Sequence, residues 1–153
     1  MTLNLNNYEI RELKGDDYNK DYLTLLSQYY QLNSSKMTQE FFNKQYEFLK
    51  KKTNCYIRVI TEPNNGKIIA SGTLFIEFKF MYDLSKVAYI DDIIVDEEYR
   101  SKGLGTKLLN HLKMLANANG CIKINIISPN NAIDFFKNNG FSNDQNHVSI
   151  KLR

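Results

Sequence analysis

The chain has 153 residues, the length of one domain, and we predict that residues 1–153 form a single domain whose core needs no disulfide or metal. Its 20 Lys and Arg against 17 Asp and Glu leave a net charge of +3, which is too small an excess for a typical nucleic-acid-binding domain and suits a small anionic ligand. Only two cysteines are present, no Cys or His cluster has metal-ligand spacing, and no apolar run approaches the roughly 20 residues of a membrane span, so we expect no metal site, no membrane insertion and a cytoplasmic location.

The first fifty residues predict one strand and two helices. Residues 8–13 alternate like a short strand, and residues 15–17 offer caps for a helix. The apolar side chains of that helix would be Tyr22, Leu23, Leu25, Leu26 and Tyr29. Thr38 can cap a second helix. We expect the apolar face of this second helix to lie in the core, and it consists of Phe41, Phe42, Tyr46, Phe48 and Leu49.

The middle of the chain predicts strands. Residues 56–60 and 68–80 are strand-like, and the Pro-Asn-Asn-Gly sequence at 63–66 between them is a turn signal, so we expect an antiparallel hairpin. Residues 89–95 form a further strand.

The last third begins with a helical period. Apolar residues recur with helical spacing from Leu104 until Asn119 and Gly120 end the helix, and residues 122–127 then alternate as a strand. A short helix follows over residues 130–139, and residues 148–152 supply a last strand. The predicted order is β-α-α-β-β-β-α-β-α-β, an α/β (α+β) fold with a mixed, mainly antiparallel central sheet flanked by helices.

The segment Arg100-Ser-Lys-Gly-Leu-Gly105 lies between a strand and an amphipathic helix, where backbone N–H groups gather at a helix N-terminus. Glycines at 103 and 105 allow a phosphate to approach, and Arg100 and Lys102 can add charge-assisted contacts. A lone G-x-G is often an ordinary turn, and neither a Walker loop nor a dinucleotide fingerprint fits, since Thr106-Lys107 reverses the Walker order and Leu108 replaces a third glycine. The segment therefore predicts a pyrophosphate site of another kind.

Residues 95–109, V-x-x-x-Y-R-S-K-G-L-G-T-K-L-L, resemble the acetyl-CoA signature of the GNAT N-acetyltransferase family, and residues 131–141 resemble its second cofactor segment. The resemblance implies the GNAT acyl-CoA N-acyltransferase fold and acetyl-CoA as the cosubstrate, without a metal. The cofactor-binding residues that it implies are Ile93, Ile94, Val95, Arg100, Ser101, Lys102, Gly103, Leu104, Gly105, Thr106, Asn131 and Phe136.

Lys79-Phe80 and residues 89–95 and 120–124 have the order and spacing found in the family's enzymes that acetylate D-glucosamine 6-phosphate, a step of UDP-N-acetylglucosamine biosynthesis, and this resemblance covers about residues 10–151. The resemblance implies an amino-sugar phosphate as acceptor and a homodimer in which the final strand of one subunit completes the other's sugar site. The implied acceptor-binding residues are Tyr30, Lys79, Phe80, Tyr82, Asp91, Asp92, Ile93 and Lys151. The residues that we expect to take part in catalysis are Asp91, Asp92, Ile94 and Tyr99, of which Ile94 and Tyr99 follow from the mechanism below rather than from the resemblance.

Asp91 and Asp92 are neighbours on a predicted strand, where successive side chains face opposite ways. We therefore expect that they cannot both point into one pocket and that they form no carboxylate dyad. One would accept a hydrogen bond from the substrate amine or hydroxyls, and the other would serve the fold or a subunit interface.

Three positions depart from the similar enzymes: Ile127 replaces an acidic residue, Phe136 a tyrosine thought to protonate the departing thiolate, and Tyr30 a threonine. These changes leave two alternatives open. One is acetylation of another amine, such as a polyamine, an amino acid or a protein N-terminus, and the other is a noncatalytic acyl-CoA-binding module.

The expected mechanism is direct transfer in a ternary complex, with positioning as the main source of rate. Backbone N–H groups at Ile93 or Ile94 would bind the oxyanion, and Tyr99 or a water would protonate the thiolate. Cys121 begins an apolar strand, which favours a structural thiol over a nucleophile, so no covalent intermediate is expected.

Overall fold

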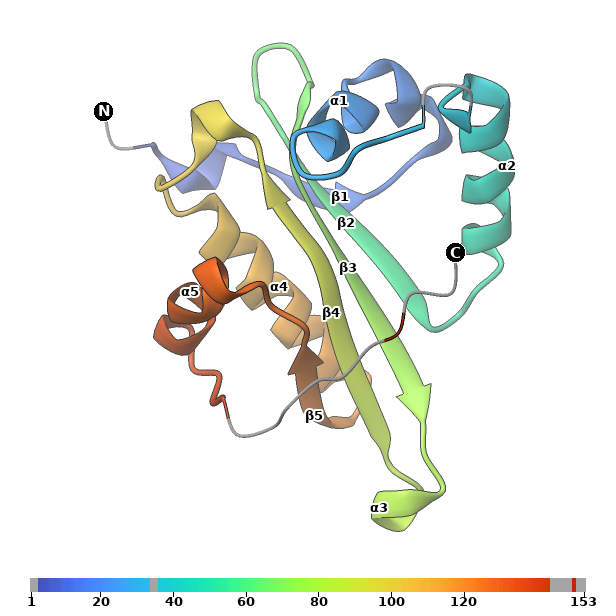
Figure 1. Ribbon diagram of the computed structural model, residues 1–153, viewed down its shortest axis with the longest axis vertical. Coiled ribbons are helices and arrows are strands. Elements are labelled where there is room, and N and C mark those ends of the chain that lie inside the picture. Colours follow the sequence, from blue (N-terminus) through green and yellow to red (C-terminus); the bar gives the residue numbers. More distant parts are fainter. Residues whose placement is uncertain (1–2, 34–35, 144–149, 151–153) are drawn as a thin grey trace.

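The computed structural model describes residues 3–33, 36–143 and 150, and its centre is a five-stranded sheet in the order β1-β2-β3-β4-β5 (Figure 1). The strands are β1 Ile10–Glu12, β2 Cys55–Thr61, β3 Ile68–Phe78, β4 Lys86–Val95 and β5 Cys121–Ile126. The first four are antiparallel to their neighbours, and β4 and β5 are parallel. The predicted mixed, mainly antiparallel sheet is confirmed, whereas the predicted last strand at 148–152 falls outside the described residues except for Ile150.

Helices cover both faces of this sheet. They are α1 Tyr22–Ser27, α2 Gln39–Lys50, α3 Met81–Leu84, α4 Leu104–Ala118 and α5 Ile133–Asn138. Leucines of α4 pack on one face and α1 packs on the other, because neighbouring residues of β2 such as Val59 and Ile60 point into two different hydrophobic clusters. No helix of the described residues is long and apolar enough to cross a membrane.

The region before β2 differs from the sequence prediction. Residues 15–19 form a separate 3-10 helix, and α1 begins only at Tyr22, after Asp21 with φ +61°. The Thr38 cap of α2 is confirmed, since its side chain accepts a hydrogen bond from the Phe41 amide. The expectation that the apolar face of α2 lies in the core is confirmed for Phe42 and Tyr46, which are half-buried and pack against the hydrophobic cluster that contains Val59 and Ile68. It is wrong for Phe41 and Phe48, which are 50% and 56% exposed. The helix also contacts the 3-10 helix of residues 15–19.

A buried carboxylate fixes the start of the chain against the sheet. Asp17 is fully buried and accepts two hydrogen bonds from the Arg11 guanidinium of β1, at 2.7 and 2.8 Å, and one from the Lys14 amide at 2.8 Å. Lys20 Nζ lies 3.3 Å from the same carboxylate. Burial raises the pKa of Asp17, but these hydrogen bonds outweigh it and the net pKa is lowered.

A β-bulge interrupts the pairing of β3 with β4. Ser71 faces Ile94 and Thr73 faces Asp91, so Gly72 alone opposes both Asp92 and Ile93. Asp92 has φ +55°, in the left-handed region that asparagine and aspartate tolerate better than most residues. The bulge turns the end of β4 and re-aims its side chains.

The Gly72→Ala variant is expected to lower the free energy of unfolding by about 1–3 kcal/mol, because it overpacks the helix-facing side of the bulge. A Cβ at position 72 would lie 3.0 Å from Leu112 Cδ1 and 3.3 Å from Leu108 Cδ2 of α4. Urea unfolding of both proteins measures the difference, and a double variant with Leu112→Ala should recover part of it. A Gly72→Ala protein as stable as the parent would show that α4 does not approach β3 this closely.

Candidate active site

The parallel strands β4 and β5 separate and leave a cavity between them. Their pairing ends at Ile90 opposite Ile126, while β4 continues for five more residues to Val95. The cavity has a volume of about 760 Å³. The residues around it come from the segment after α1, the end of β4, the start of α4 and the chain from β5 into α5: Tyr29, Tyr30, Ile90, Asp91, Asp92, Ile93, Ile94, Val95, Tyr99, Arg100, Ser101, Gly103, Gly105, Thr106, Ile126, Ile127, Pro129, Asn131, Ala132, Phe135 and Phe136.

One end of the cavity is the uncapped N-terminus of α4. Gly103 precedes the helix with φ +90°, no side chain caps it, and the Lys107 amide makes the first α-helical hydrogen bond, to Gly103 O at 3.0 Å. The amides of residues 104–106 thus have no partner within the helix and carry its partial positive charge. Gly105 lies on the cavity wall, where a Cβ would sit 3.4 Å from the Phe135 ring. The arrangement fits a bound diphosphate.

The cationic side chains near this turn differ in orientation. Arg100 lines the cavity, with Nε donating to Val95 O at 3.1 Å and the guanidinium 4.8 Å from the centre of the Tyr29 ring. Lys102 instead donates to Glu98 O at 2.6 Å and is not among the lining residues. Leu104, also predicted as a cofactor residue, has a buried side chain, so only its backbone amide can take part. The other ten predicted cofactor residues line the cavity.

Asp91 and Asp92 both line the other end of the cavity, so the expectation that they cannot share a pocket is wrong. The strict alternation of a strand fails here because the bulge and the positive φ of Asp92 turn the backbone between the two residues. Tyr30 donates a hydrogen bond to Asp92 Oδ1 at 2.9 Å. Burial, together with this bond, raises the pKa of Tyr30 to about 12, and burial with the Asp92 charge raises the pKa of Asp91.

Three predicted acceptor residues lie elsewhere. Lys79, Phe80 and Tyr82 are at the tip of the β3–β4 hairpin around α3, at the opposite end of β4 from Val95 (Figure 1), and none lines the cavity. Lys79 pairs with Glu77 at 2.5 Å, and Phe80 is 94% exposed. The structure therefore does not bring these three to the acids of the same chain, and Lys151 falls outside the described residues.

Sequence reasoning missed two aromatic walls of the cavity. Tyr29 donates to Val95 O at 3.3 Å, although its helical spacing suggested a core position. Phe135 packs edge-on against Phe136 beside Gly105. The signal available for Phe135 was its place beside a predicted cofactor residue, whereas nothing in the local sequence places Tyr29 beside β4.

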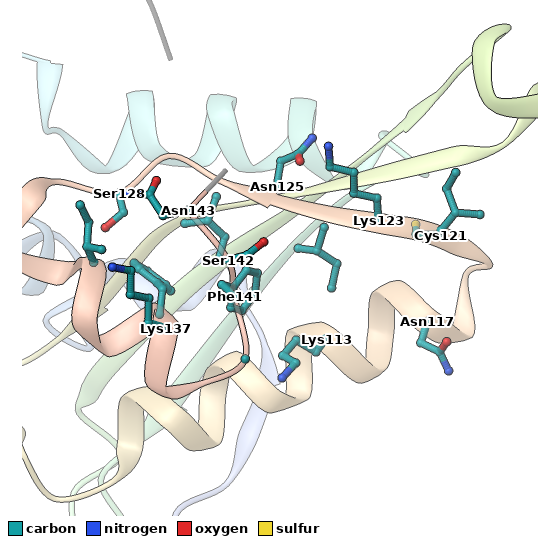
Figure 2. A pocket seen from close by; sticks show the side chains of 16 residues that line it. Lys113, Asn117, Cys121, Lys123, Asn125, Ser128, Lys137, Phe141, Ser142 and Asn143 are labelled. Carbon is teal, nitrogen blue, oxygen red and sulfur yellow. The ribbon is translucent and has the colours of Figure 1, made fainter. Parts of the chain in front are cut away.

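A second hollow, of about 480 Å³, lies along the outer edge of β5 (Figure 2). Lys113 of α4, Lys123 of β5 and Lys137 of α5 line it, and Lys113 donates to Asn139 O at 3.0 Å. It contains no carboxylate among its described residues, and it shares Ile126 and Phe136 with the wall of the first cavity. Among the described residues no group of three or more His, Cys, Asp or Glu side chains could hold a metal ion.

The model of the acetyltransferase (GNAT) family matches residues 9–141, which include all five strands of the sheet and every residue that lines the cavity. The chain belongs to the GNAT acetyltransferase family. Enzymes of this family use acetyl-CoA, whose diphosphate suits the uncapped start of α4.

Relatives within the family have nearly full-length similarity. The chain is 33% identical to glucosamine 6-phosphate N-acetyltransferase 1 of Dictyostelium discoideum over 93% of this chain and 89% of that protein. It is also 33% identical to glucosamine 6-phosphate N-acetyltransferase of Arabidopsis thaliana, over 93% of this chain and 95% of that protein. A crystal structure of the Arabidopsis glucosamine-6-phosphate N-acetyltransferase superimposes with a TM-score of 0.90 at 31% identity, covering 95% of this chain and 99% of that one. The predicted GNAT fold is thereby confirmed.

Proposed function

We propose that this GNAT chain transfers the acetyl group of acetyl-CoA to the amine of D-glucosamine 6-phosphate, giving N-acetyl-D-glucosamine 6-phosphate and CoA, a step toward UDP-N-acetylglucosamine. The observation that carries the proposal is a single cavity with an anion-binding helix start at one end and two carboxylates at the other. The names of its relatives identify the amine that those enzymes use.

In this proposal acetyl-CoA lies between β4 and β5. The amides of residues 104–106 and the Arg100 side chain hold the diphosphate, since charge-assisted hydrogen bonds are the strongest available there. The unpaired edge of β4 up to Val95 offers backbone groups to the pantetheine arm. Asn131 and Phe136 close the other wall. Lys102 contributes charge near the turn rather than a direct contact.

The acceptor binds at Asp91 and Asp92, beside Tyr30 and Ile93. Its phosphate requires cations that these residues do not supply. We place Lys79, Phe80, Tyr82 and Lys151 there only through a homodimer, in which the exposed hairpin tip or the C-terminal segment of one subunit reaches the cavity of the other. The large apolar exposure of that tip supports an interface: Phe78, Phe80, Met81, Tyr82 and Leu84 are all exposed.

Catalysis is direct transfer in a ternary complex. The neutral amine attacks the thioester carbonyl, and the oxyanion binds a backbone N–H of β4. Ile94 pairs with Ser71 of β3, whereas Ile93 lies in the bulge and shares Gly72 with Asp92, which favours the Ile93 amide for this role. We assign protonation of the thiolate to Tyr99, because it lines the cavity and Phe136 has no hydroxyl. Positioning of the two substrates supplies most of the rate.

Thiol release from acetyl-CoA tests the proposal when glucosamine 6-phosphate, glucosamine, spermidine and a peptide amine are compared. We expect the highest kcat/KM with the sugar phosphate. Faster turnover of another amine would keep the fold and cofactor but discard the sugar assignment, in line with the changes at Ile127 and Tyr30. Tight acetyl-CoA binding without release in the presence of any of the four amines would favour the binding module.

The cellular setting belongs to the same proposal. A cytoplasmic, single-domain enzyme agrees with the two cysteines, Cys55 and Cys121, which are both free thiols. Burial raises the pKa of each thiol, so neither is an activated nucleophile.

A further inference from the structure

Three consecutive residues after α1 are hydrogen-bonded to the end of β4. Gln28 contacts Asp96 Oδ2 at 3.2 Å and accepts from the Glu97 amide at 3.0 Å. Tyr29 donates to Val95 O at 3.3 Å. Tyr30 donates to Asp92 Oδ1 at 2.9 Å. The hydrogen bonds of Gln28 and Tyr29 fix the backbone before Tyr30. The Tyr30 side chain is therefore held in position to donate to Asp92.

The two acids of the cavity are therefore not equivalent. Asp92 has a donor, whereas the Asp91 carboxylate accepts no hydrogen bond from any described residue. The lining residues from the described part of the chain include no other carboxylate, no histidine and no lysine. Position 127, on the opposite wall, is an exposed isoleucine that cannot accept a proton. Among the described lining residues, Asp91 has the one carboxylate without a hydrogen-bond partner.

We propose that Asp91 is the residue that takes the proton of the acceptor ammonium, and that Tyr30 is a positioning residue that holds Asp92 so that Asp91 alone faces the amine. This inference rests on the function proposed above and assigns separate roles within the acid pair. The assignment rests on this chain's own side chains, because Tyr30 donates to Asp92 and the opposite wall carries Ile127.

The proton balance is simple. The ammonium proton passes to the Asp91 carboxylate and leaves a neutral amine. The amine nitrogen then forms the C–N bond as the C–S bond breaks, and a second nitrogen proton leaves for the CoA thiolate, directly or through Tyr99. Asp91 afterwards loses its proton to solvent. The raised pKa of Asp91, from burial and the Asp92 charge, brings it closer to that of the amine that it must deprotonate.

The charged and titratable groups around Asp91 come from two sides. They are Tyr29 and Tyr30 after α1, and Asp92, Tyr99 and Arg100 on and after β4. The described wall from β5 to α5 contributes only Ile126, Ile127, Pro129, Asn131, Ala132, Phe135 and Phe136, none of which titrates. Loss of the Tyr30 hydroxyl would remove the donor of the Asp92 carboxylate, so that both carboxylates of the pair would compete for the amine proton.

The test is the pH profile of kcat/KM for glucosamine 6-phosphate in the full-length protein. We expect Asp91→Asn to lower kcat/KM about 100-fold with the KM for acetyl-CoA unchanged, and Asp91→Glu to restore most of it. Tyr30→Phe should move the acid limb to higher pH. The matched control is Tyr18→Phe, which removes a hydroxyl that donates to Met37 O, outside the cavity, and should leave the limb in place. All proteins are assayed with the same amine, so the ionisations of the amine affect every pH profile equally.

Two results would overturn the inference: an Asp91→Asn enzyme within threefold of the parent, or a Tyr30→Phe enzyme whose rate falls equally at every pH. Failure of the proposed function looks different, because the parent itself would then not acetylate glucosamine 6-phosphate. If the parent turns over another amine of the panel, the same variants are measured with that amine.

Discussion

The Asp17→Ala variant is expected to lose about 3–5 kcal/mol of the free energy of unfolding, because it leaves the Arg11 guanidinium without its buried partner. The same carboxylate also satisfies the Lys14 amide, so the change breaks the link between β1 and the 3-10 helix before α1. Urea unfolding followed by circular dichroism measures the loss. The matched control is Asp16→Ala, since Asp16 is exposed and pairs only with Lys20, and its removal should leave stability nearly unchanged.

The pH dependence of stability gives a second view of Asp17. Its folded pKa lies below the unfolded value of about 3.9, so its contribution is complete above that value and is lost as the pH falls through the folded pKa. Between pH 6 and pH 3 the parent should therefore lose more stability than Asp17→Ala. Two results would contradict the burial of this ion pair. One is a parallel dependence of the free energy of unfolding on pH in the parent and in Asp17→Ala. The other is a loss of unfolding free energy in Asp17→Ala no larger than that in Asp16→Ala.

The Gly105→Glu variant is expected to weaken acetyl-CoA binding at least about 100-fold while keeping the fold. The new carboxylate would project into the cavity at the start of α4 and compete with the diphosphate for the amides of residues 104–106. Loss of two charge-assisted hydrogen bonds, each worth about 1.5–3 kcal/mol, corresponds to a change of this size. A carboxylate in the first turn is itself favourable to the helix dipole, so the melting temperature should not fall.

Calorimetric titration with acetyl-CoA measures the affinity of Gly105→Glu, and Asn110→Glu serves as the control. Asn110 is an exposed residue of the same helix, away from the cavity, so it receives the same charge without entering the site. If both variants bind acetyl-CoA like the parent, the diphosphate does not lie at the start of α4. An equal, modest loss in both would indicate only a long-range effect of charge.

Elements with strong local patterns could be predicted from the sequence. The 63–66 turn with its flanking strands and the long α4 helix agree with the structure, because their periodicity and end signals lie within each segment. The phosphate-binding turn at the start of α4 was predictable for the same reason, since its glycines and basic residues all lie within residues 100–105. Five of the ten predicted cofactor residues that line the cavity come from residues 100–106.

Features that depend on distant parts of the chain were not predictable. The bulge at Asp92 exists because Gly72 of another strand faces two residues, so a rule based on alternation alone placed Asp91 and Asp92 on opposite sides. The aromatic residues of α2 have helical spacing, but Phe42 and Tyr46 pack on a core cluster while Phe41 and Phe48 stay exposed, and spacing alone does not show which of them will be covered. Lys79 lies at the hairpin tip, at the end of β4 that is opposite to Val95. The lengths of β3 and β4 determine this position.

The most direct test of the central proposal is the fate of a labelled acetyl group. The chain is mixed with acetyl-CoA carrying ¹³C in the carbonyl and with glucosamine 6-phosphate, and the carbonyl carbon is followed by NMR. The account predicts that the label moves from the thioester to an amide on the sugar nitrogen, at the rate of CoA release and without residence on the protein. Label that appears as acetate, on the protein, or on a sugar oxygen would contradict it.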